Sequence, residues 1–87
     1  MQLQILTPDK VAYDGEAEAL LVPGKSGPFE ILKGHAPILS SLVPGEVRLR
    51  KDKMEITYQV SSGFLEFHGD QAVVLVDTAE SRTAPTA

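Results

Sequence analysis

The sequence contains no cysteine and no tryptophan among its 87 residues. Without cysteine, neither a disulfide nor a thiolate metal site is available. Long hydrophobic runs are also missing: runs such as residues 73–76 are far shorter than the roughly 20 residues that a membrane-spanning helix needs. The chain does not open with a basic segment followed by an apolar core, which argues against a signal peptide. We therefore expect a soluble chain that meets a membrane only through a partner.

Positive charge is scarce as well. The formal net charge is −4, which argues against nucleic acid as a partner. The only basic cluster covers residues 48–53 and includes Asp52. A solvated strand and turn is the favoured interpretation of this cluster, and a phosphate-binding face is the alternative.

A two-residue alternation of apolar and polar side chains dominates what is present. It runs through residues 2–5, 46–50 and 54–60, and such alternation is typical of strands with one buried and one solvated face. Residues 18–23 and 72–77 are instead continuously apolar at their centres, which favours strands that are covered on both faces or central in a sandwich.

Turn-forming residues separate these segments at short intervals. They are Pro8-Asp9, Asp14-Gly15, Pro23-Gly24, Gly34, Pro44-Gly45, Ser62-Gly63 and Gly69-Asp70. Short strands divided by frequent turns predict an all-β sandwich or barrel. The pattern ends after Asp77, and the remaining stretch is too short and too poor in large apolar side chains to pack. We expect one β domain over residues 1–80 and a short flexible tail over residues 81–87.

No constellation of catalytic or metal-ligating residues is recognisable. The two imidazoles, His35 and His68, lie in different predicted loops, without a metal-ligand spacing and without a third ligand. No serine sits in a G-x-S-x-G elbow, and residues 24–27 lack the spacing of a phosphate-binding loop. An active site built from Ser62, His35 and Asp77 has no spacing to support it. We expect no catalytic, cofactor-binding or metal-binding residues.

Residues 24–47 combine repeated glycine and proline with many large apolar side chains. A loop region that stays apolar while turns interrupt it either covers an edge of the core or meets another protein. Rigid turns would hold such a region in one shape and so reduce the entropy lost on association. The sequence thus favours binding over catalysis.

Three segments carry a family pattern: "GPFEILKGHAPILSSLVPGEVRL" (27–49), "YQVSSGFLEF" (58–67) and "VVLVDTAE" (73–80). Their distinctive features are Gly-His-Ala-Pro before an apolar run, Leu-x-Pro-Gly before a basic and apolar strand, and an Asp-Thr-Ala-Glu ending. Together they closely resemble the N-terminal β-sandwich of the epsilon subunit of rotary ATP synthases, named delta in mitochondria. The opening residues 3–27 follow the same pattern, so the resemblance covers essentially residues 1–80.

The resemblance implies a sandwich or flattened barrel of about ten strands in the central stalk of the synthase. One end of it would rest on the ring of membrane-embedded c subunits, and one face would pack against the gamma subunit. Such a chain is a non-catalytic part of the rotor that joins gamma to the c-ring and helps couple ion flow to ATP synthesis. We accordingly expect no cofactor, small-molecule substrate or nucleic acid, and a peripheral place on the cytoplasmic face of a bacterial inner membrane, or the equivalent stromal or matrix face.

The resemblance also implies two groups of contact residues. Residues 27–37 match the region that meets the polar loops of the c-ring, with Glu30 and Lys33 as charges able to pair with ring side chains. Thr7 and Ser40, with the strand surface around them, match the side that faces gamma. The implied c-ring contacts are Gly27, Pro28, Phe29, Glu30, Lys33, His35, Ala36 and Pro37.

The chain departs from the family pattern in two places. The family usually has Gly-Glu-aliphatic-Gly where this chain has Gly27-Pro28-Phe29-Glu30, so the acidic ring contact is either moved to Glu30 or lost. The turn must differ too, because proline fixes φ at about −65° and donates no backbone hydrogen bond. The family also usually continues into a C-terminal helical hairpin that inhibits ATP hydrolysis in many members. Since this sequence ends at Ala87, we expect neither the hairpin nor its inhibitory function.

For His35 we expect a ring that caps the sandwich edge and bonds a backbone carbonyl, at a protein–protein contact.

A second hypothesis about function stands beside the rotor subunit. It is a free-standing β-sandwich that binds a small ligand or nucleic acid through residues 48–53. The acidic net charge and the lack of aromatic residues beside that strand argue against this alternative.

Overall fold

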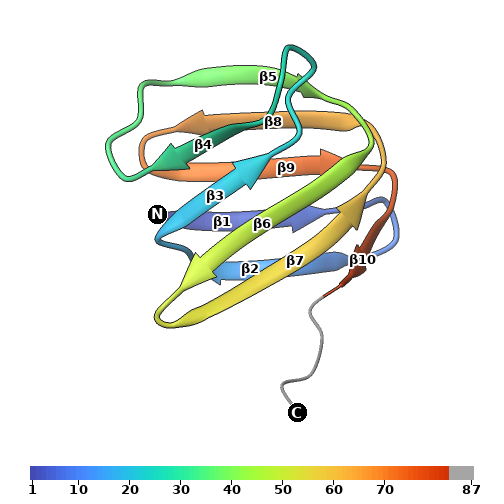
Figure 1. Ribbon diagram of the computed structural model, residues 1–87, viewed down its shortest axis with the longest axis horizontal. Helices are drawn as coiled ribbons and strands as arrows, with labels where there is room; N and C mark the ends of the chain where they lie inside the picture. The colour runs from blue at the N-terminus through green and yellow to red at the C-terminus, as the bar shows by residue number, and fades with distance from the viewer. Residues whose placement is uncertain (83–87) are drawn as a thin grey trace.

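Ten β-strands in two five-stranded sheets make up the computed structural model, which describes residues 1–82 (Figure 1). Sheet A holds β1 (Gln2–Leu6), β2 (Val11–Glu16), β5 (Ile38–Leu42), β8 (Gly63–His68) and β9 (Gln71–Val76). Sheet B holds β3 (Ala19–Val22), β4 (Phe29–Leu32), β6 (Gly45–Lys51), β7 (Met54–Val60) and β10 (Ala79–Ser81). The prediction of an all-β sandwich of about ten strands is confirmed, and residues 1–82 contain no helix.

The strand order is β2-β1-β9-β8-β5 in sheet A and β10-β7-β6-β3-β4 in sheet B. All pairs are antiparallel except β1 with β9, where the first strand pairs in parallel with a strand near the other end of the chain. The edge strands β4 and β5 lie on the same side of the sandwich (Figure 1). Within residues 1–82 no helix is long and apolar enough to cross a bilayer.

The core is built from the inward half of the alternating pattern. Each inner face contributes aliphatic side chains that meet those of the opposite sheet. The largest fully buried side chains are Leu3, Ile5, Leu20, Val22, Ile31, Val47, Leu49, Leu65 and Val74. Met54 has the parity of the buried face but is exposed, because it stands at the tip of the β6–β7 hairpin.

The two sheets are also tied by a tyrosine. The hydroxyl of Tyr58 on β7 donates to the backbone carbonyl of Ala12 on β2, with 3.0 Å between the oxygens. Burial raises the pKa of Tyr58, and the nearby Tyr13 adds to this effect. The bond satisfies a polar group that would otherwise be costly to bury.

Of the two interpretations of the continuously apolar segments, the structure confirms an interior position in a sandwich and not the covering of both faces. β9 is central in sheet A, and Val74 and Val76 are buried, but Leu75 is 50% exposed and Val73 is half-buried. In β3, Leu21 is likewise only half-buried. The fold has only two layers, so the outer faces of both sheets are not covered by other described residues. The apolar outer face of β9 is therefore available to a partner.

The stretch after Asp77 also packs better than predicted. Ala79 begins β10, pairs with Val60 of β7 and is buried. A small side chain suffices here because backbone pairing, not side-chain volume, attaches the strand. β10 runs to Ser81, one residue past the predicted domain end at residue 80. Residues 83–87 of the predicted tail lie outside the described residues.

The hydroxyl of Ser61 fixes the passage from sheet A to β10. Its Oγ accepts the backbone N–H groups of Asp77 and Thr78 at 2.9 and 3.0 Å and donates to the carbonyl of Ser62. Replacing Ser61 by alanine would leave two donors without this acceptor. We expect Ser61→Ala to lower the free energy of unfolding by about 1–2 kcal/mol, measured by urea denaturation.

Ser62→Ala is the matched control for this prediction. Ser62 is the exposed neighbour, and its substitution should change the unfolding free energy by less than about 0.5 kcal/mol. Equal losses in the two variants would mean that the hydroxyl of Ser61 has no special role in the turn.

Candidate functional site

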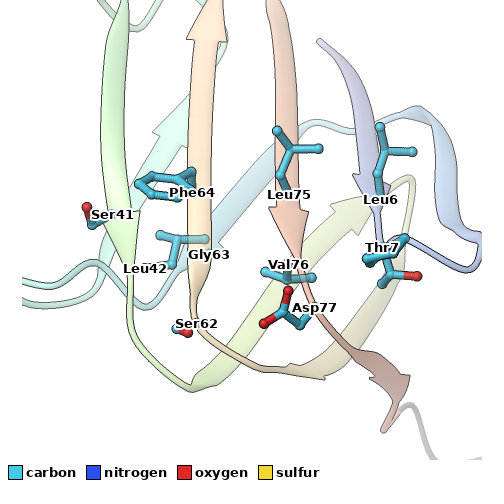
Figure 2. A pocket seen from close by; sticks show the side chains of 11 residues that line it. Leu6, Thr7, Ser41, Leu42, Ser62, Gly63, Phe64, Leu75, Val76 and Asp77 are labelled. Atoms are coloured by element: carbon cyan, nitrogen blue, oxygen red, sulfur yellow. The ribbon is translucent and has the colours of Figure 1, made fainter.

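The outer face of sheet A carries a row of exposed apolar side chains. Phe64 of β8 pairs with Leu75 of β9, and Leu75 pairs with Leu6 of β1. Phe64 and Leu75 are 54% and 50% exposed, and Leu6 is half-buried. These three residues are called the apolar row below, and Figure 2 shows them side by side on three neighbouring strands.

Strand alternation explains why these side chains point outward. In β8, Leu65 and Phe67 are buried, so Phe64 must face away from the core. The row continues at a β-bulge to Val11 of β2, which pairs with Leu6 and is 59% exposed. Clustered apolar side chains on an open sheet face favour an interaction surface over a solvated one.

A hollow of about 710 Å³ borders the apolar row at the end of sheet A where the chain crosses to sheet B (Figure 2). Its wall is mostly apolar, with a few hydroxyls and one carboxylate at the rim. It is lined by Leu6, Thr7, Pro8, Ser41, Leu42, Ser62, Gly63, Phe64, Leu75, Val76 and Asp77. The row and the hollow together form a continuous, mostly non-polar surface on sheet A.

The two predicted gamma contacts, Thr7 and Ser40, do not share one surface in the structure. Thr7 lies at the rim of the hollow, and its Oγ1 accepts the backbone N–H of Lys10 at 3.1 Å, so its hydroxyl also holds the β1–β2 turn. Ser40 pairs with the buried Leu65 and therefore faces the inner side of β5. Its neighbour Ser41 pairs with Phe64 and lines the hollow. Thr7 and Ser41 thus line the same hollow from opposite sides, whereas Ser40 faces inward.

The predicted c-ring contacts line one lateral edge of the sandwich. Residues 27–28 belong to the β3–β4 loop, Phe29 and Glu30 to the edge strand β4, and residues 33–37 to the β4–β5 loop at the opposite end (Figure 1). Glu30 and Lys33 are exposed, whereas Phe29 is half-buried against the core. The structure therefore connects these residues along a strand instead of gathering them in one loop.

His35 has the architectural geometry predicted for it. Its Nδ1 lies 2.7 Å from the backbone carbonyl oxygen of Ala36, which can only accept a hydrogen bond, so Nδ1 is the donor. The ring stands edge-on to Phe67, with 6.0 Å between the ring centroids. Ser62 and Asp77 lie at the other end of β8, so the structure does not join the three residues into a catalytic site. Among residues 1–82 no group of three potential metal ligands is found.

The basic cluster at residues 48–53 is partly neutralised. The guanidinium of Arg48 lies 3.1 Å from a carboxylate oxygen of Glu46 and 3.7 Å from one of Glu55. Asp52 occupies the turn with φ of 56°, and its N–H donates to Glu18. This arrangement is that of a solvated strand and turn, as the sequence favoured.

Comparison with known proteins identifies the fold and the family together. Residues 1–82 match the model of the family described as ATP synthase, Delta/Epsilon chain, beta-sandwich domain. The chain belongs to this family. It is therefore a non-catalytic subunit of an ATP synthase, and the resemblance of its sequence is confirmed.

Members of the Delta/Epsilon family are similar along most of the chain. The ATP synthase epsilon chain of Chlorobaculum tepidum is 43% identical over 76 residues, which cover 86% of each chain. That of Chromohalobacter salexigens is 46% identical over 79 residues, or 90% of this chain and 56% of the relative. The chain thus spans most of the first relative and little more than half of the second.

Two solved structures share the fold. A chain from the Euglena gracilis mitochondrial ATP synthase matches with a TM-score of 0.85 at 20% identity, over 91% of this chain and 51% of that chain. A chain from the Tetrahymena thermophila mitochondrial ATP synthase matches with a TM-score of 0.81 at 18% identity, over 94% and 66%. At these identities the likeness establishes the sandwich architecture.

The family resemblance names Thr7, which lines the hollow, but the sequence analysis does not name Ser41, Phe64 or Leu75. Two signals for the apolar row were available. Phe64 alternates with Leu65, and Leu75 lies inside a continuous apolar run, so one member of each pair must face outward in a two-layer fold. What the sequence lacked was the register that places them side by side.

Proposed function

We propose that the chain acts in the central stalk of a rotary ATP synthase, where it joins the gamma subunit to the c-ring and helps couple ion flow to ATP synthesis. The observation that supports this most directly is the apolar row on sheet A of a Delta/Epsilon family member. A subunit without catalytic residues needs surfaces for its neighbours, and an exposed apolar sheet face is such a surface.

In this proposal the gamma subunit docks on the outer face of sheet A, over the apolar row and the adjoining hollow. Thr7 and Ser41 lie at the border of that surface, and Ser40 supports it from the inner side of β5. Burying Phe64 and Leu75 against gamma would remove apolar area from water at about 25 cal/mol per Å² before the costs of association.

The c-ring contact in this proposal is the β4 edge with its two flanking loops. Glu30 is exposed on the outer side of β4, where it pairs with Leu21 of β3, so its carboxylate can replace the acid that Pro28 displaces. The β4 edge and the face of sheet A are different sides of the sandwich, so both partners can be held at once (Figure 1). The chain would then reach the cytoplasmic face of the membrane, or its stromal or matrix equivalent, only through the c-ring.

Copurification with a gamma subunit tests the central point. The tagged chain, coexpressed with gamma from the same source, should yield a stable complex of one copy of each, with a molar mass measurable by light scattering. The proposal would be contradicted if the chain is shown by circular dichroism to be folded but does not bind gamma.

The double variant Glu30→Ala/Lys33→Ala tests the c-ring assignment. Both side chains are exposed, and exposed charge pairs contribute about 0.2–1 kcal/mol each, so we expect roughly fivefold weaker binding of the gamma-bound chain to isolated c-ring. Proton pumping driven by ATP in reconstituted vesicles should fall with it, while gamma binding and the melting temperature stay unchanged.

Lys53→Ala/Glu80→Ala is the control, because it removes the same charges at places away from β4: Lys53 lies in the β6–β7 turn, and Glu80 lies on β10 at the other edge of sheet B. Its binding to the c-ring should equal that of the wild type. Loss of gamma binding in the Glu30/Lys33 variant would show that the assignment of gamma to sheet A and of the c-ring to the β4 edge is wrong. Unchanged c-ring binding would show that Glu30 and Lys33 are not part of the ring contact.

A further inference from the structure

The two sheets differ sharply in the charge of their strands. The strands of sheet A contain no lysine and no arginine, and their charged residues are Asp14, Glu16 and Glu66. The strands of sheet B carry Arg48, Arg50 and Lys51 among their own acids. The face that bears the apolar row is thus free of basic side chains along its strands and has an acidic character.

The acids lie in a defined place relative to the apolar row. A second row of paired residues crosses sheet A, two residues along the strands from the apolar row. In it Asp14 pairs with Gln4, Gln4 with Val73, and Val73 with Glu66. These four residues are called the acidic row. It runs about 7 Å from the apolar row, because Glu66 is two residues after Phe64. Its two carboxylates are separated by three strand spacings, or about 14 Å.

The two carboxylates are available to a partner. Asp14 and Glu66 are exposed, and within residues 1–82 neither takes part in an ion pair. Glu16, by contrast, is engaged by the chain itself: it accepts a hydrogen bond from the amide of Gln2 at 2.8 Å and lies 3.5 Å from the terminal amine of Met1. Only part of the acidic charge is therefore compensated internally.

A small hollow beside Asp14 has the chemistry of a cation pocket. It measures about 170 Å³, and its polar wall is formed by Asp14 and the amides of Gln2, Gln4 and Gln71. Because Gln2 donates its amide nitrogen to Glu16, its amide oxygen is left as an acceptor. A carboxylate beside an amide oxygen suits the head of a lysine or arginine side chain.

We propose that the acidic row selects the partner that the apolar row binds: a basic segment of the gamma subunit surface, with one lysine or arginine in the hollow beside Asp14 and another near Glu66. This inference rests on the proposed docking of gamma on sheet A. The apolar row supplies most of the affinity, while the acidic row steers and orients the encounter, because exposed interface charges act chiefly on the association rate. The absence of basic residues from the strands of this face means that nothing on them repels such a segment.

The variant Asp14→Asn/Glu66→Gln tests the proposal with little change in shape. Its association rate with purified gamma, measured by stopped-flow at about 0.05 M salt, should fall roughly fivefold, and at about 0.5 M salt it should match the wild type because the charges are screened. Both residues are exposed, so the melting temperature should stay within a few degrees of the wild type.

The control is Asp52→Asn/Glu80→Gln, which makes the same two chemical changes and the same change in net charge outside sheet A, in the β6–β7 turn and on β10. Asparagine tolerates the positive φ of position 52. If both variants slow association equally, net charge alone acts and the acidic row is refuted, although docking of gamma stands. If the Asp14/Glu66 variant binds like the wild type at low salt, the inference also fails. If wild-type chain does not bind gamma at all, the proposed function and this inference fall together.

Discussion

Replacing Gly63 by alanine should cost about 3 kcal/mol of unfolding free energy, which is a large share of the stability of a domain this small. A Cβ at this position would overlap the backbone carbonyl oxygen of Leu75 and lie 2.8 Å from the Cγ1 of Val76. Gly63 pairs with Val76 on one side and with Leu42 on the other, so the backbone cannot shift without breaking one of the two ladders. Urea unfolding followed by circular dichroism measures the loss.

Gly15→Ala is the matched control in another strand of the same sheet. There a Cβ would meet the side-chain hydroxyl of Tyr13 at 3.3 Å, and an aromatic side chain can move by a few tenths of an ångström. The loss should be about 1 kcal/mol or less. A folded Gly63→Ala variant as stable as Gly15→Ala would show that β8 and β9 can separate at this end of the sheet.

The double variant Phe64→Ala/Leu75→Ala should weaken gamma binding about 100-fold or more, while leaving the sandwich folded. Large apolar side chains at the centre of an interface carry most of its binding energy, and two of them are removed at once. Both are about half exposed in the isolated chain, so their truncation should lower the unfolding free energy by only about 1 kcal/mol. Titration calorimetry with purified gamma measures the affinity.

Leu32→Ala/Met54→Ala controls for non-specific apolar contacts. These side chains are 47% and 62% exposed, but they belong to strands of sheet B. This variant should bind gamma as the wild type does. Equal weakening in both double variants would mean that sheet A is not the docking face.

Most of the strand pattern of the fold is predictable from residue alternation, but continuous apolar runs and very short strands are not. Alternation correctly identified the inward side chains of β6 and β7, such as Val47 and Val60. For β9 it left two interpretations open, because five consecutive apolar residues from Ala72 fit either a strand covered on both faces or a central strand of a sandwich, and the second is correct. It also missed β10, because a strand attached by backbone pairing needs only one small buried side chain, that of Ala79.

The candidate site was only partly predictable, since it depends on register between distant strands. The family resemblance pointed to Thr7 and Ser40, and the sequence itself contained Phe64 and Leu75. A one-residue change of register reverses which face a side chain occupies, and no local pattern distinguishes Ser40 from Ser41. The pairing of β5 with β8 places Ser41 on the outer face of sheet A and Ser40 on the inner face.

The parallel pairing of β1 with β9 has a consequence for the time course of synthesis. The first strand lies between β2 and β9, so sheet A cannot close until the residues of β9 have left the ribosome. Contacts between such distant parts of a chain make folding slow compared with that of helical bundles. Until then the inner faces of both sheets are open to solvent or to other chains. Early capture of the nascent sandwich by a chaperone or by its own stalk partner would therefore protect it from aggregation.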